Sequence, residues 1–158
     1  MQEFLNVKDV KVIRMFRRNH LKTVISQMRA EEYARQTEAQ TGTAQWGVRI
    51  TDKPLPPSKI DISVMSERIE TIKEDQEDLR AMYFRTCIDV YYEELNADLN
   101  EELQRVSEFL GVDFDPDFTP PFRKATPDDL TKAITNFSEV ENWMKESSFE
   151  SGFLGIGS

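Results

Sequence analysis

The hydrophobic pattern of the first third of the chain predicts a strand, a turn and a long helix. Residues 10–16 form a nearly continuous apolar run, which is typical of a strand buried on both faces of a parallel sheet. Residues 17–20 form a short turn. Apolar residues then recur at helical spacing, namely Leu21, Val24, Ile25 and Met28. The helix is expected to continue past Tyr33 and to end near residues 41–43.

The middle of the chain predicts a loop, a helix, a strand and a second helix. Residues 52–58 contain three prolines, which lack backbone donors and exclude a helix or a central strand. An amphipathic helix is expected from Ser63 onward. Residues 87–92 are mostly β-branched or aromatic, which predicts a strand, and this strand is expected to end at residues 93–95. The next helix carries Leu99, Leu103, Val106 and Leu110. Gly111 follows, where a helix C-cap requires positive φ.

The last third predicts a rigid connection over residues 113–121 and one further helix. This helix is expected to start at residues 126–129, where a threonine cap precedes a proline and two acidic residues. Its inward-facing residues would be Leu130, Ile134, Phe137, and Val140 or Trp143. Residues 150–158 are glycine-rich and are expected to form a flexible tail. Residues 1–158 are expected to form a single domain, because this length supports one core.

Composition excludes several classes of protein. The net charge of −9 argues against nucleic-acid binding, because a positive surface is needed to displace counterions. No apolar run is long enough to span a membrane. Cys87 is the only cysteine, and the only histidine is His20, so we expect no disulfide and no metal site. A cytoplasmic location fits this cysteine usage best.

Charge is unevenly distributed along the chain. Residues 10–30 contain no acidic residue but six basic ones: Lys11, Arg14, Arg17, Arg18, Lys22 and Arg29. A basic tract inside an acidic chain indicates a local site for a small polyanion. The predicted strand and helix place this tract where open α/β sheets bind ligands, beyond the carboxyl end of a strand and beside a helix N-terminus. Chance clustering is the alternative.

Arg18 and Ser26 form an R-N-x6-S pattern at the end of the predicted strand and the start of the predicted helix. An arginine fork and a hydroxyl at this spacing suit a phosphate group. The pattern resembles that of sulfotransferases that use 3′-phosphoadenosine 5′-phosphosulfate (PAPS), in which these two residues bind the 3′-phosphate. Taken alone, a surface arginine and a helix serine bonded to its own backbone explain the pattern equally well.

Two further segments are similar to the same family. Residues 90–95, with the helix ending at residues 109–111, resemble the family's Y-E-D-L strand and L-G helix, although Glu94 replaces the usual aspartate. The resemblance implies that Tyr92 lies against the adenine, whereas a plain strand residue is the alternative. Residues 122–126 resemble a basic lid, followed by an I-x-N pattern over residues 134–136. The lid residue that closes over the phosphate would be Arg123 or Lys124, and the alternative is a loop without a ligand.

The resemblance implies a P-loop-type sulfotransferase fold of the α/β class, incomplete, with a small parallel sheet and a predominantly helical covering. The cofactor implied is PAPS, or its product 3′,5′-adenosine bisphosphate (PAP), and the acceptor remains an undefined hydroxyl or amine. No glycine in the sequence belongs to a phosphate loop of the G-x-x-x-x-G-K-[ST] type. We therefore expect this chain to correspond to the C-terminal part of the family's domain and to be inactive by itself. No catalytic residue is assigned.

An incomplete sheet leaves an open edge, which predicts pairing with a complementing N-terminal fragment or self-association. The alternative function is a non-catalytic helical interaction module, in which the basic strand, turn and helix bind an acidic protein partner.

Overall fold

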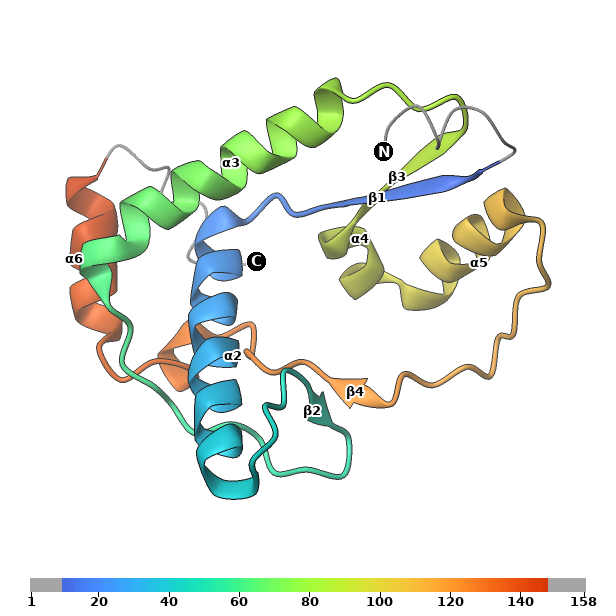
Figure 1. Cartoon of the computed structure of the whole chain (residues 1–158). Coiled ribbons are helices and arrows are strands. Elements are labelled where there is room, and N and C mark those ends of the chain that lie inside the picture. Colours follow the sequence, from blue (N-terminus) through green and yellow to red (C-terminus); the bar gives the residue numbers. More distant parts are fainter. Residues whose placement is uncertain (1–9, 148–158) are drawn as a thin grey trace. The chain divides into compact units, whose positions relative to one another are not determined.

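The computed structural model describes residues 10–147 and shows an α/β protein that is mostly helical. Five α-helices, two short 3-10 helices and four strands occur within these residues (Figure 1). The described chain divides into two compact units. Unit 1 contains residues 10–18 and 71–118, and unit 2 contains residues 19–70 and 119–147. The tail predicted for residues 150–158 lies outside the described residues.

Unit 1 is built on a two-stranded parallel sheet. Strand β1 (Val12–Phe16) pairs with strand β3 (Cys87–Tyr91) over five register positions. The side chains of Phe16 and Tyr91 meet at the carboxyl ends of the strands, with ring centroids 5.7 Å apart. The strand predicted at residues 10–16 and the one predicted at residues 87–92 are both confirmed, and they form the small parallel sheet that was expected.

The interior placement predicted for β1 is wrong in part. Ile13 and Met15 have exposed fractions of 40% and 55%, so one face of the strand is open to solvent. Phe16 is 1% exposed, and on β3 Val90 is also 1% exposed. Within residues 10–147 the sheet has only these two strands, so β1 lacks the second neighbour that an interior strand of a parallel sheet has.

Arg14 ties β1 to β3 and to a helix end. Its Nε donates to the Asp89 carboxylate at 2.7 Å across the sheet. Its Nη1 lies 3.3 to 3.4 Å from the carbonyl oxygens of Leu79, Arg80 and Met82, at the C-terminus of helix α3 (Met65–Ala81). A helix end has carbonyls without intrahelical partners, and a cation placed there satisfies them. The long amphipathic helix predicted from Ser63 is confirmed as α3.

Two helices complete unit 1. Helix α4 (Tyr92–Ala97) follows β3 directly and was missing from the sequence analysis. Helix α5 (Leu99–Leu110) was predicted, and its amino end is capped by the Asp98 side chain, which accepts from the backbone N–H of Glu101. Gly111 ends it with φ 75°, a value that favours glycine, as the sequence predicted.

Unit 2 is dominated by helix α2 (His20–Thr41), the predicted helix. Asn19 caps it by accepting from the backbone N–H of Lys22 at 2.8 Å, and Gly42 closes its far end with φ 75°. The buried residues of α2 recur at helical spacing and are Leu21, Thr23, Val24, Ile25, Arg29 and Ala34. The loop predicted at residues 52–58 is confirmed, because no helix or strand crosses it.

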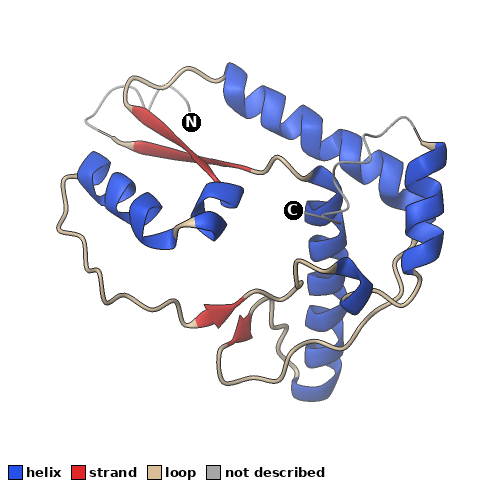
Figure 2. Ribbon diagram, turned by 180° about the vertical axis from the view of Figure 1, so that it is seen from behind, coloured by secondary structure: helices blue, strands red, loops and turns tan. Residues whose placement is uncertain are grey.

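The helix predicted from residues 126–129 starts later than expected. A 3-10 turn (Leu130–Lys132) comes first, and helix α6 (Phe137–Glu146) begins only after Asn136. The reason is a tertiary interaction: Ser58 bonds to the backbone on both sides of Ile134, at 3.0 and 3.1 Å, and pairs this segment with the loop at Ser58 before α6 begins. Figure 2 shows the loop, drawn in tan, between these two short helical elements.

A short antiparallel pair and an apolar core complete unit 2. Strand β2 (Val48–Arg49) pairs with strand β4 (Phe122–Arg123). The 3-10 turn at Ile62–Val64 leads into α3. Apolar residues from all parts of the unit are at most 2% exposed, including Ile60, Met65, Ile69, Leu130, Ile134, Val140 and Met144. None of the helices within residues 10–147 is long and apolar enough to cross a membrane.

Candidate anion-binding site

Arg18 lies in unit 1 and is held by the segment that follows β3. Its guanidinium forms an ion pair with Glu94 and lies over the ring of Tyr91, with Cζ 4.0 Å from the ring centroid. Its backbone N–H donates to the Glu93 carboxylate at 3.0 Å. The Arg18 side chain is nevertheless 53% exposed. A surface ion pair of this kind is weak, so the guanidinium can exchange Glu94 for another anion.

Tyr92 begins α4, and one face of its ring is covered by Arg17. The Arg17 Cζ lies 3.8 Å from the ring centroid, and the backbone N–H of Arg17 donates to the side-chain oxygen of Gln76 at 3.1 Å. The Arg17 Nε is buried and has no hydrogen-bond partner. An arginine stacked on a tyrosine is a cation–π contact. Arg17 therefore covers one face of the ring for which the resemblance predicts a contact with adenine.

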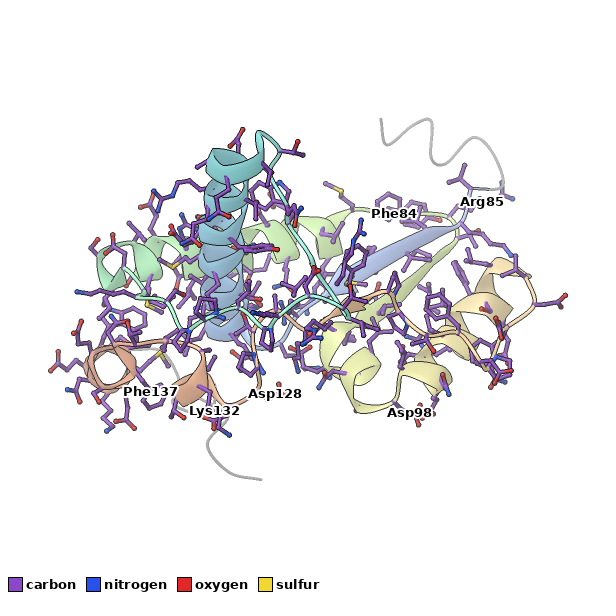
Figure 3. The ribbon with its side chains drawn as sticks, turned by 90° about the horizontal axis from the view of Figure 1, so that it is seen from below. Phe84, Arg85, Asp98, Asp128, Lys132 and Phe137 are labelled. Carbon is purple, nitrogen blue, oxygen red and sulfur yellow. The ribbon has the colours of Figure 1, made fainter. Side chains whose placement is uncertain are left out.

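Unit 2 contains a second basic cluster, in which Lys22 of α2 and Lys124 of the predicted lid meet at one carboxylate. Both ammonium groups bond to the Oδ1 atom of Asp128, Lys124 at 2.5 Å. Asp128 lies in the loop before the 3-10 turn and is labelled in Figure 3. Two positive charges thus share one negative charge. The first turn of α2 contains no acidic residue, so the cluster keeps an excess positive charge at this helix end.

Ser26 lies on the same helix between two residues that contact this loop. Lys22 precedes Ser26 by one helical turn, and Arg29 follows it by one turn, so the three lie on adjoining positions of one helix face. Arg29 donates to the backbone carbonyl of Ala125 at 3.5 Å, while Lys22 shares Asp128 with Lys124. The loop therefore approaches α2 on both sides of Ser26, and Ser26 is half-buried.

Arg123 is directed elsewhere. Its guanidinium donates to the carbonyl oxygen of Ile50, beside the short β2–β4 pair, and its Nε is buried without a partner. Of the two basic lid residues, only Lys124 joins the cluster with Lys22. The sequence analysis left the choice between them open, and this geometry favours Lys124.

Arg29 is a structural residue of the cluster. It is 2% exposed, and its Nη1 donates to the carbonyl oxygens of Ala133 and Pro56 and to the Ser58 hydroxyl. Burial lowers the pKa of this guanidinium, although an arginine stays protonated at neutral pH. Arg29 therefore holds the Ala125 and Ala133 segments against α2 through backbone groups and cannot itself reach a ligand.

Comparisons with known proteins do not extend this description. Family models, curated proteins and solved structures yield no match. The assignment of a function rests on the geometry and the sequence patterns alone.

Sequence reasoning missed two members of the unit 2 cluster. Lys22 was noted only as part of the basic tract, and Asp128 only as part of a helix start. Hydrogen bonds from Lys124 and Lys22 lower the pKa of the Asp128 carboxyl, so it is ionised at neutral pH. Lys22 and Asp128 lie 106 residues apart, and no local pattern connects them. Within residues 10–147 there is also no group of three potential metal ligands.

Proposed function

We propose that this protein binds the 3′-phosphoadenosine part of PAPS, with the 3′-phosphate held at the unit 2 cluster of Lys22, Ser26 and Lys124. One observation carries the proposal. The helix that carries Ser26 of the R-N-x6-S pattern and the basic lid resemble the sulfotransferase family separately, and they contact each other within unit 2 through Asp128 and Arg29. Nothing in the periodicity of either segment requires this contact.

The chemistry of the cluster suits a phosphate monoester. Two ammonium groups and a hydroxyl supply several donors, and the excess of positive charge favours a dianion. Hydrogen bonds to charged groups contribute about 1.5 to 3 kcal/mol each, which is enough to distinguish a 3′-phosphorylated nucleotide from AMP. The roles predicted for Arg18 and Tyr92 remain predictions, and the Arg18 pair with Glu94 would have to open for a phosphate.

Transfer of the sulfuryl group would require more than this cluster. In such a reaction an acceptor hydroxyl or amine attacks sulfur and loses a proton to solvent, the bond from sulfur to the bridging oxygen of the 5′-phosphate breaks, and PAP leaves with that electron pair. Groups that grip the 5′-phosphosulfate must stabilise the leaving oxygen. The glycines within residues 10–147 are Gly42, Gly47 and Gly111, and none lies in a phosphate loop. We propose that catalysis occurs only when another segment supplies that loop.

Ser26→Ala tests the proposed 3′-phosphate contact. The affinity for PAP, measured by calorimetry on the full chain, is expected to fall about tenfold or more, because a hydroxyl donor to a charged oxygen is lost. The affinity for AMP should not change. The matched control is Ser66→Ala, which removes an exposed hydroxyl from α3.

An unchanged PAP affinity in Ser26→Ala would contradict the contact. Arg18→Ala in the same titration tests the role that the sequence predicts for that residue. If neither PAP nor AMP binds the unmodified chain, the helical interaction module becomes the better account of the basic residues.

A further inference from the structure

We propose that the Asp128 carboxylate acts as an internal competitor, which fills the phosphate position between Lys22 and Lys124 while no ligand is bound. The inference rests on the proposed function, and it adds one thing to it: the affinity of the site for phosphate depends on the displacement of Asp128.

The first argument is the geometry of the shared oxygen. Both ammonium groups converge on Oδ1 of Asp128, rather than on separate oxygens. A phosphate oxygen placed there would meet the same two donors. A phosphate dianion carries twice the charge of a carboxylate and more acceptor oxygens, so it is the stronger partner for two lysines.

The second argument is exposure. The side chains of Lys22 and Lys124 are 15% and 26% exposed, whereas that of Asp128 is 67% exposed. The lysines are thus held in place by their surroundings, while the carboxylate lies on the solvent side and can move away. Exposed ion pairs contribute little to stability, so releasing Asp128 should not unfold the loop. The cap of the following 3-10 turn is supplied by Asp129 instead, which accepts from the backbone N–H of Thr131.

The third argument comes from Thr126, in the same loop. Its hydroxyl is buried, the residue is 2% exposed, and Oγ1 has no hydrogen-bond partner. Buried hydroxyls in native proteins are nearly always paired. The conformation in which Asp128 bridges the lysines therefore leaves one polar group of the loop unsatisfied, as expected for a loop that also has a second, ligand-bound arrangement.

Asp128→Asn distinguishes a competitor from a supporting residue. Calorimetry with PAP and with inorganic phosphate should show about tenfold tighter binding in Asp128→Asn, because the competing charge is removed while the shape is kept. The matched control is Asp129→Asn, which removes the same charge one residue away and should change the affinity less than about twofold. Lys22→Ala should weaken phosphate binding in both backgrounds. Circular dichroism verifies that each variant is folded.

The outcomes separate the inference from the proposed function. If Asp128→Asn binds PAP and phosphate more weakly than the unmodified protein, or equally well, Asp128 is not a competitor. This holds even if the unmodified protein still prefers PAP to AMP. If neither the unmodified protein nor Asp128→Asn binds PAP or phosphate, the competitor and the proposed function both fail. A second readout is the Nζ resonance of Lys22 and Lys124, which should shift on addition of inorganic phosphate, and the absence of any shift contradicts the site.

Discussion

Replacement of Arg29 by alanine should lower the free energy of unfolding by about 3 to 5 kcal/mol. The side chain is 2% exposed and bonds to the backbone carbonyls of Pro56 and Ala133 and to the Ser58 hydroxyl. Without the guanidinium these groups are left buried without their donor, and a cavity forms beside α2. Urea unfolding followed by circular dichroism measures the loss.

Two effects oppose each other at Arg29, and a second variant separates them. Burial of the positive charge is unfavourable, as the lowered pKa of Arg29 indicates. Removing the charge therefore offsets part of the stability that is lost with the hydrogen bonds. Arg29→Met keeps most of the volume but removes the donors, and should cost about 1 to 3 kcal/mol. Arg35→Ala is the control on the same helix, because its side chain is 76% exposed and should change stability by less than about 0.5 kcal/mol. If Arg29→Met is as stable as the unmodified protein, the hydrogen bonds donated by Arg29 have no structural role.

Asn136→Ala should lower the free energy of unfolding by about 2 to 5 kcal/mol. The Asn136 side chain accepts from the backbone N–H of Ile60 and donates to its carbonyl oxygen, both at 2.9 Å. Asn136 is 8% exposed and Ile60 is 1% exposed, so the alanine variant leaves two buried backbone groups unpaired. Such groups cost more than the bond itself contributes, because water cannot replace the lost partner.

The control for Asn136 is Asn100→Ala, which makes the same chemical change at an exposed position of α5. It should alter stability by less than about 0.5 kcal/mol. Amide hydrogen exchange provides the local readout: the Ile60 N–H should lose its protection in Asn136→Ala and keep it in Asn100→Ala. Equal stability of the two variants would show that the Ile60 bonds are not needed.

Elements stabilised by their own sequence were predictable. The apolar run of β1, the helical spacing of α2, and the spacing and C-terminal glycine of α5 all depend on residues near one another in the chain. Their bounds differ from the predicted ones by a few residues at most. The α/β class followed from these elements. Helix α4, only six residues long, carries too few apolar positions to show a period, which is why it was missed.

Features that depend on distant residues were not predictable. The start of α6 is set by Ser58 and Asn136, which bond to segments far away in the chain, although a local cap at Thr126 indicated an earlier start. Arg29 illustrates the same limit. Arg29 belongs to the basic tract of residues 10–30, yet its partners include backbone carbonyls up to 104 residues away, which no composition or spacing reveals.

The basic tract of residues 10–30 shows why a charge cluster in sequence differs from one in space. Arg14 bonds to Asp89 and to a helix end, Arg18 pairs with Glu94, and Arg29 is buried. Lys22 shares the Asp128 carboxylate with another basic residue, Lys124, which lies outside the tract. The candidate site was therefore predictable at Ser26 and Lys124, which carry a family resemblance, and not at Lys22 or Asp128.

The difference in affinity between PAP and AMP, measured by calorimetry on the unmodified full chain, tests the central claim most directly. The two ligands share the adenosine and the 5′-phosphate and differ only in the 3′-phosphate. The account predicts that PAP binds at least about tenfold more tightly, a difference of about 1.4 kcal/mol from new charge-assisted hydrogen bonds. Equal affinities would contradict recognition of the 3′-phosphate.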